Sequence, residues 1–378
     1  MDKWFKVAAT AMTLFFMGLG ASHASATNVK FNSFLEQVAF KGDFRVRHES
    51  FWKAQSTDRH RERYRLRLGT GFKFPSDMEL KTRFASGTGE QVSTNQSFDN
   101  LSSQNTFFID QAYLVMKGPM DSKIQAGRMS HPFWMVYSSD IVWDGDFSPM
   151  GFSQSISRDM GGNKWFLNLL EMVADEDSGS QNDQWMFGGQ LGMNISRMDD
   201  DWALTAALAG YEWTNETAGT FGQGAANEGN RRTGTAPGTL SNNFRVAELT
   251  VEYWMRLMER PLSIQGTYIN NIGNQLTPAE NTGLQVGFIY GNTKSEGDWE
   301  IAYFNKRSES DATVADVADS DFGDGGTNRQ GHIVWFARSM GAATTFNVKY
   351  FTTQVLNTAL APGLDDITRL QVDFSVKI

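Results

Sequence analysis

Apolar and polar residues alternate with a period of two along much of this chain, and that period is characteristic of β-strands. The alternation is clearest at residues 369–378. Its apolar phase consists of Leu370, Val372, Phe374, Val376 and Ile378, and its polar phase of Arg369, Gln371, Asp373, Ser375 and Lys377. Residues 61–72 and 298–303 repeat the pattern. We interpret each segment as a strand with one apolar face and one face in water.

The connections between these segments alternate in length. Short connections are expected at 74–77, 118–121, 198–201, 258–261, 294–297 and 339–342. Long polar connections are expected at 53–60, 87–105, 175–183, 214–243, 271–280, 308–328 and 356–365. Short turns at one end and long loops at the other are typical of outer-membrane β-barrels. Further strands are expected to start near Phe44, Met78, Phe107, Ser122, Trp165, Trp185, Trp202, Phe244, Leu262, Leu284, His332 and Thr344.

Residues 129–163 decide the strand count. Without a strand in this segment two long connections would follow one another, so we assign a strand to 152–158 and a short turn to 159–163. The total becomes even, which places both ends of the barrel on one rim. The sequence therefore predicts an all-β fold, a transmembrane antiparallel up-and-down β-barrel of about 16 strands with short periplasmic turns and long extracellular loops. A barrel of this size is wide enough for an aqueous channel.

The first residues predict export. Lys3 and Lys6 precede an apolar stretch at 7–19, and small residues at 24–26 suit cleavage of a signal peptide. The alternative, an N-terminal membrane anchor, is less favoured because a spanning helix needs ~20 apolar residues. We expect a signal peptide at 1–26 that is cleaved near Ala26, a periplasmic segment at 27–43, and a barrel at 44–378 in the bacterial outer membrane.

Composition narrows the class of protein further. The chain has no cysteine, which excludes a disulfide scaffold. Its mean hydropathy of -0.40 agrees with strands whose apolar and polar faces cancel. The net charge is -9, and loss of Asp2, Lys3 and Lys6 with the signal peptide makes it -10, which argues against nucleic acid as a partner. We expect no cofactor.

Three stretches between residues 107 and 152 read FFIDQAYLVMKG, IQAGRMSHPFW and SSDIVWDGDFSPMGF. Together with the arginine-rich segment at 61–67, they resemble the bacterial "putative porin" family of outer-membrane barrels. The resemblance implies a sixteen-stranded passive diffusion pore for small polar or charged solutes. It also implies that the loop at 129–149 folds inward and narrows the channel. The expected partners are outer-membrane lipid and lipopolysaccharide, the barrel-assembly machinery, and further copies of the chain in a homotrimer.

Basic residues gather on the inward phase of neighbouring strands. They are Arg45, Arg47, Arg61, Arg63, Arg65, Arg67, Lys81, Arg83 and Arg369. We expect them in the lumen, because Lys or Arg that faces lipid at the bilayer midplane costs ~2 to 4 kcal/mol. The inward loop would place Asp140, Asp144 and Asp146 opposite this basic wall, and facing charges of this kind select solutes. An alternative is that the arginines pair with Glu62, Glu49 and Asp43 and only hold strands together.

The aromatic residues of the same loop have two interpretations. They are Phe133, Trp134, Tyr137 and Trp143. Aromatic rings can stack on the apolar faces of sugars, but anchoring of the loop on the inner wall is the favoured interpretation.

Residues 311–326 combine aspartates with glycines, and loops rich in carboxylate oxygens can bind calcium. The acidic residues include Asp316, Asp319, Asp321 and Asp324. No EF-hand spacing is present, so we expect a solvated extracellular loop and no metal site.

The histidines outside the signal peptide are His48, His60, His131 and His332. The sequence contains neither a Gly-x-Ser-x-Gly motif nor a paired-His metal motif, so we expect no enzyme. The alternatives to a passive pore are a substrate-specific uptake channel and, from another class, a secreted β-rich carbohydrate-binding protein.

Overall fold

A computed structural model describes residues 35–75, 77–179, 181–196, 201–219, 228–233, 238–273, 275–360 and 364–378. Within these residues, sixteen long antiparallel strands make up the wall of a barrel. The first eight strands are β1 (Gln37–Lys53), β2 (Arg59–Phe74), β3 (Met78–Ser86), β5 (Phe107–Lys117), β6 (Lys123–Arg128), β7 (Met150–Met160), β8 (Asn163–Asp175) and β9 (Gln184–Ser196). The other eight are β10 (Trp202–Thr214), β13 (Arg245–Leu257), β14 (Arg260–Asn271), β15 (Thr282–Gly291), β16 (Trp299–Ser308), β17 (Arg329–Gly341), β18 (Thr344–Val355) and β19 (Ile367–Lys377).

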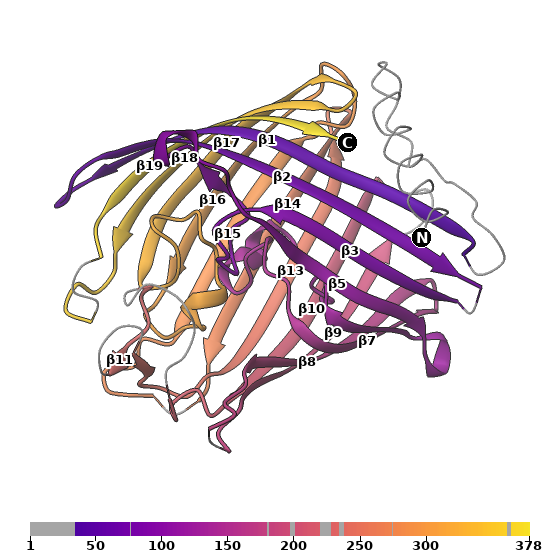
Figure 1. Ribbon diagram of the computed structural model, residues 1–378, viewed down its shortest axis with the longest axis horizontal. Helices are drawn as coiled ribbons and strands as arrows, with labels where there is room; N and C mark the ends of the chain where they lie inside the picture. Colours follow the sequence, from indigo (N-terminus) through magenta and orange to yellow (C-terminus); the bar gives the residue numbers. More distant parts are fainter. Residues whose placement is uncertain are drawn as a thin grey trace.

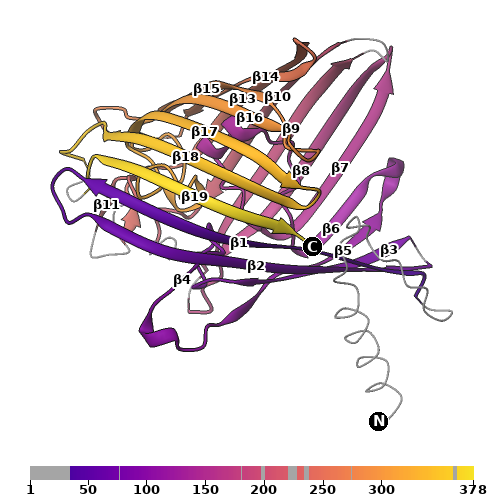
Figure 2. The same ribbon diagram turned by 90° about the horizontal axis from the view of Figure 1, so that it is seen from above.

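Each strand pairs with its neighbours in sequence, and the first pairs with the last (Figure 1). The closing pair runs from Asp43 opposite Lys377 to Lys53 opposite Ile367. Figure 2 shows β19 lying beside β1. The predicted closed, all-β, antiparallel barrel is therefore confirmed. In the described part of the chain, no helix is long and apolar enough to cross a membrane.

Strand positions agree closely with the alternation pattern. Four predicted starts are the first residues of strands, namely Met78, Phe107, Trp202 and Thr344. The strand predicted at 152–158 is β7, and it joins β8 through Gly161 and Gly162, which both have positive φ. Glycine adopts this left-handed conformation without steric cost. The parity of long and short connections therefore identified a real strand.

The N-terminal boundary differs from the expectation. β1 begins at Gln37 and not near Phe44, so the later part of the predicted segment 27–43 belongs to the barrel wall. Its apolar members Val38 and Phe40 continue the alternation. The predicted signal peptide at 1–26 and residues 27–34 lie outside the described residues.

Side chains alternate between an exposed outer face and a buried inner face. On β10, for example, Leu208 is 63% exposed whereas Ala207 is 3% exposed. On β19 Phe374 is exposed, and Arg369 and Asp373 are buried, as their phases predict. An inner face that carries charges needs partners for them, because an unpaired buried charge is costly.

A β-bulge interrupts the register between β3 and β5. Arg83 is opposite Gln111 and the next residue, Phe84, is opposite Ile109, so Asp110 is the extra residue. A bulge turns two successive side chains to the same side. Asp110 and Gln111 are both buried, and Asp110 reaches Arg83 on the inner face.

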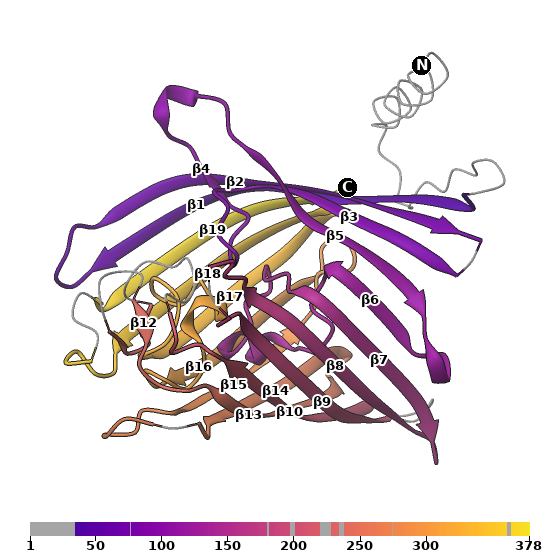
Figure 3. The same cartoon turned by 60° about the horizontal axis from the view of Figure 1, so that its bottom comes forward.

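Minor elements lie in the connections. They are β4 (Gln96–Ser97), β11 (Arg232–Thr233), β12 (Thr239–Leu240) and the 3-10 helices η1 (Asn100–Ser102), η2 (Pro119–Asp121), η3 (Tyr137–Ile141) and η4 (Ala315–Val317). We name three long connections L2 (87–106), L3 (129–149) and L7 (309–328). L2 carries β4 and η1 and projects beyond the barrel wall (Figures 2 and 3).

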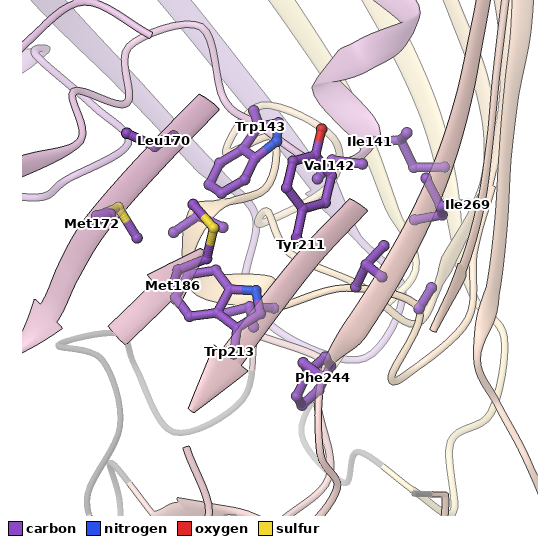
Figure 4. Packing of buried hydrophobic residues seen from close by; sticks show 14 of the residues in the cluster. Ile141, Val142, Trp143, Leu170, Met172, Met186, Tyr211, Trp213, Phe244 and Ile269 are labelled. Carbon is purple, nitrogen blue, oxygen red and sulfur yellow. The ribbon is translucent and has the colours of Figure 1, made fainter. Parts of the chain in front are cut away.

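Two apolar clusters lie inside the barrel. In the first, Val142 and Trp143 of L3 pack with Met186 and Tyr211 from the inner faces of β9 and β10 (Figure 4). This cluster also contains Val314 and Val317 of L7. The second cluster joins Phe322 of L7 to the inner faces of β16, β17 and β18, through Phe304, Ile333, Trp335 and Phe351. L3 and L7 are thus packed against the inner wall.

Candidate functional site

The predicted basic residues lie on the inner face of adjacent strands at the closure of the barrel. Arg45 and Arg47 belong to β1, Arg61, Arg63, Arg65 and Arg67 to β2, Lys81 and Arg83 to β3, and Arg369 to β19. In the register of β1 with β2, Arg45 is opposite Arg65 and Arg47 is opposite Arg63. Directly opposed like charges are destabilising, so the arrangement depends on carboxylates between them.

Glu49 is the central carboxylate of this arginine wall. Its side chain is fully buried, and it accepts hydrogen bonds from Arg369 and, at 2.5 Å, from Arg61 Nε. Arg63 Nη1 and Arg47 Nη1 each lie 3.6 Å from a Glu49 oxygen. One carboxylate therefore shares four arginines that come from three strands.

Two other carboxylates complete the wall. Asp373 binds Arg47 through two hydrogen bonds, of 2.7 Å to Nε and 2.9 Å to Nη2. Asp43 lies 2.9 Å from Arg65 Nη2 and 2.7 Å from Arg67 Nε. The pairing that the alternative interpretation expected thus exists for Glu49 and Asp43. Glu62 is different, because it lies on the outer face and hydrogen-bonds His48.

L3 crosses the interior and meets several strands. The Trp134 N–H donates to Gln190 of β9 at 2.8 Å, and Ser138 hydrogen-bonds Thr267 of β14 at 2.8 Å. η3 contacts β14, β15 and β16, and it lies within the ring of strands in Figure 3. Trp143 is only 1% exposed, so its ring has no free face for a sugar.

The three predicted loop acids do not share one position. Asp146 reaches the arginine wall, 2.9 Å from Arg67 Nη1 and 3.9 Å from Arg65 Nη1. Asp140 and Asp144 instead meet L7: the Asp319 N–H donates to the Asp140 carbonyl, and the Ser320 N–H donates to the Asp144 carboxylate. Loop and wall are therefore in direct contact at Asp146.

L7 was expected to be a solvated loop, and that expectation is wrong. Asp311 pairs with Arg231, Asp316 with Arg232, and Asp319 with Lys306, and all three aspartates are buried. Among the described residues, no group of three or more His, Asp or Glu side chains could hold a metal ion. The available signal was the interleaving of Val314, Val317 and Phe322 with the acids, because a solvated loop has no need of regularly placed apolar residues.

L7 also places Asp321 on the arginine wall. One Asp321 oxygen lies 2.8 Å from Arg369 Nη2, 3.0 Å from Gln371 Nε2 and 3.4 Å from Arg47 Nη1. The Asp321 backbone carbonyl accepts a further bond from Arg369 at 2.6 Å. Sequence reasoning missed this residue as a member of the wall, because the contact joins positions far apart in the chain.

Comparison with known proteins decides the family. The model of the family described as "Putative porin" matches residues 50–237 and 225–378. The chain belongs to this family. The predicted resemblance is therefore confirmed, and the coarse function follows from it: the protein is an outer-membrane porin, of a family and a fold that suggest a channel and not an enzyme.

Solved structures of low sequence identity share the fold of this family member. The high-pH structure of Pseudomonas putida OprB has a TM-score of 0.56 and 11% identity, with 90% of this chain and 94% of that chain covered. Salmonella typhi OmpF in complex with daunomycin has a TM-score of 0.53 and 11% identity, with 93% and 100% covered. No curated protein matches this chain significantly in sequence.

Contact between L3 and L7 gathers acids in this porin. Burial and repulsion from Asp319 raise the pKa of Asp140 to about 8. Burial and repulsion from Asp146 and Asp319 raise the pKa of Asp144 well above its usual value. For Asp321 burial acts in the same direction, but attraction by Arg369 and Arg47 outweighs it and places the pKa well below its usual value. The L3–L7 contact and the arginine wall thus favour opposite charge states of the loop acids.

The outer face of the porin carries a small polar cluster. His48 Nδ1 lies 2.6 Å from Glu62 Oε1, and His48 Nε2 lies 3.0 Å from Ser50 Oγ. Glutamate, histidine and serine in this order resemble an acid, base and nucleophile. His60 Nδ1 also lies 2.9 Å from Ser50 Oγ, and Ser50 is only 4% exposed. The hydroxyl therefore has no open approach for a substrate carbonyl.

Proposed function

We propose that this porin passes small polar or charged solutes by passive diffusion, along a path lined by the arginine wall and narrowed by L3. The observation that carries the proposal is the contact of Asp146 in L3 with Arg65 and Arg67 on the wall. This contact supports a narrow part of the lumen at which acidic and basic groups meet. Charges held in a narrow part of a pore determine which ions and polar solutes pass.

The proposed path requires the loop to stay in position. Apolar packing of Trp143 and the hydrogen bonds of Trp134 and Ser138 hold L3 against β9, β10 and β14. These contacts hold L3 rigidly, and so they fix the position of the Asp146 carboxylate. A mobile loop would instead average its charge over the lumen and discriminate solutes poorly.

The family places this porin in the outer membrane. We expect export with cleavage near Ala26, insertion by the barrel-assembly machinery, and contact of the apolar outer face with lipid and lipopolysaccharide. The short turns would face the periplasm and the long loops the exterior. The exposed outer rows, such as Leu191, Leu208 and Leu249, are consistent with lipid contact.

We further infer a homotrimer. L2 pairs through β4 with the first half of β2, where Ser97 is opposite Arg63, and it projects beyond the wall (Figure 3). L2 exposes two apolar side chains, Phe98 directly after β4 and Leu101 in η1. Such residues on a projecting loop suit contact with a second copy. Cross-linking of the detergent-solubilised porin should give a trimer that Leu101→Asp weakens.

A second candidate function is a substrate-specific uptake channel. L7 favours it, because a second loop folded onto the arginine wall makes the lumen more restrictive than L3 alone would. A liposome-swelling panel of sugars, amino acids and phosphorylated compounds separates the two functions. A general pore admits all small solutes in order of size, whereas a specific channel admits one class.

The decisive experiment is single-channel recording in planar bilayers. Neutralisation of Arg63, Arg65 and Arg67 to Gln should shift the ion selectivity toward cations, because positive charge leaves the wall. Arg256→Gln is the matched control, since Arg256 is exposed and pairs with Asp201 at the turn. If the selectivity is indifferent to the triple change, the arginine wall has no part in the mechanism.

A further inference from the structure

The contact of Asp321 with the arginine wall resembles a ligand in a binding site. Arg47, Arg369 and Gln371 direct three nitrogens at one Asp321 oxygen, at 3.4, 2.8 and 3.0 Å. Two arginines and an amide around one carboxylate are a strong arrangement for recognition of that group. We call these three residues the Asp321 site. The Asp321 side chain is 29% exposed, so solutes in the lumen can approach it.

We propose that the Asp321 site is a binding site for carboxylate solutes, that Asp321 occupies it in the resting porin, and that a passing carboxylate displaces Asp321. The proposal rests on the proposed function, because it requires a solute path along the arginine wall.

The site keeps its shape without Asp321. Arg47 is held by the two hydrogen bonds that it donates to Asp373, and Arg369 and Gln371 are held by the hydrogen bonds that they donate to Glu49. Arg369 also lies 4.7 Å from the centre of the Phe51 ring. A guanidinium that is held by other partners loses little freedom when a ligand binds, which favours binding.

The site also keeps an excess of positive charge without Asp321. Arg45, Arg47, Arg61, Arg63 and Arg369 lie on this part of the wall, against the two wall carboxylates Glu49 and Asp373. Buried charge that lacks a counter-charge is costly. Departure of Asp321 is therefore favoured only when another anion takes its place, and this couples movement of the loop to the arrival of an anionic solute.

L7 offers a segment that can move without the rest of the loop. Asp319 is anchored to Lys306 at 2.9 Å, and Phe322 is buried in the second apolar cluster. Asp321 lies between these two anchors, and its remaining contacts are polar bonds to the wall and to Asp319. Departure of the Asp321 side chain breaks its bonds to the wall and so loosens residues 320–321, while the anchors on either side stay in place.

Succinate block of the ion current in planar bilayers tests the proposal. In Asp321→Asn the competing charge is gone, so the succinate concentration that halves the current should fall about tenfold. Asp324→Asn is the matched control, because Asp324 belongs to the same loop but pairs with Lys53 at 3.2 Å, and it should change that concentration less than about twofold. Glucose should block neither variant.

The possible results distinguish failure of the Asp321 site from failure of the proposed pore. If the unmodified porin conducts and Asp321→Asn leaves succinate block unchanged, the proposal is overturned while the pore stands. An equal gain for inorganic phosphate would overturn the assignment to carboxylates. If the unmodified porin forms no channels, the proposed function itself fails.

A second measurement needs no variant. Succinate should increase proteolytic cleavage of L7 in the unmodified porin, because displacement of Asp321 loosens the loop. Glucose at the same concentration serves as the control. Equal cleavage with and without succinate would contradict the displacement of Asp321.

Discussion

The inner surface of the barrel has an ionic part and an apolar part. On β1, β2 and β19 the inner side chains are arginines and carboxylates, with Glu49 at their centre. On β8, β9 and β10 they include Leu170, Met186 and Tyr211, on which Trp143 packs. The apolar part positions the loops, and the ionic part receives their acids. Two kinds of contact therefore hold the loops inside this barrel, an apolar support and a charged wall, and separate strands supply them.

Removal of Glu49 should be the most damaging single change to the ionic part. Glu49→Gln leaves four arginines around an uncharged side chain, and loss of one partner from a buried ion pair costs about 3 to 5 kcal/mol. Urea unfolding of the lipid-embedded porin measures the effect. Glu62→Gln is the control, since Glu62 pairs with His48 on the outer face and is half exposed. An equal loss of unfolding free energy in the two variants would mean that the arginine wall does not depend on Glu49.

Trp143→Ala should have the next largest effect and act on the apolar part. A buried Trp→Ala change costs about 3 kcal/mol or more, because transfer energy is lost and a cavity remains. L3 should become open to protease while the barrel stays folded. Trp134→Ala is the control, because the hydrogen bonds of Trp134 to Gln190 use its backbone. An L3 that stays resistant in Trp143→Ala would show that its hydrogen bonds suffice.

Raising the pH should loosen the contact between the two loops. The pKa of Asp140 in the folded porin is about 8, above the usual value of about 4. Asp140 therefore holds a proton when the loops are in contact and releases it when they separate. The stability of the contact between L3 and L7 is fully present below about pH 4 and is lost as the pH rises through 8. Cleavage of L3 and L7 should be faster at pH 9 than at pH 5. Asp140→Asn should weaken this dependence, and equal cleavage rates at both pH values in the unmodified porin would contradict it.

The smallest expected effect is the coupling between the two parts. Glu49 and Trp143 belong to different sets of contacts, so their changes should add to within about 0.5 kcal/mol in the double variant. A double-mutant cycle on urea unfolding measures the difference. A coupling above about 1 kcal/mol would show that loop docking and the ionic wall depend on each other.

Much of the wall could be predicted from the sequence, because the alternation of side chains is local. The phases of 61–67 and 369–373 placed Arg65, Arg67 and Arg369 inside, and the lengths of connections revealed β7. These inferences need only the period of a strand and the parity of a barrel. They do not depend on which residues meet across the lumen.

The loops could not be predicted in the same way. The burial of L7 depends on Arg231, Arg232 and Lys306, which lie on other segments, and no spacing within 311–326 encodes them. The position of Asp146 was expected only from resemblance to a family. Its contact with Arg67 became visible only when the strands and L3 were placed together.

The pairing of β1 with β19 has a consequence for assembly. Arg47 and Asp373 are 326 positions apart, yet they share two hydrogen bonds. An open sheet, or one closed out of register, would leave Arg47 and Glu49 without Asp373 and Arg369. Buried charges without partners raise the free energy of every incorrect closure. The ionic wall therefore favours the correct register between the first strand and the last.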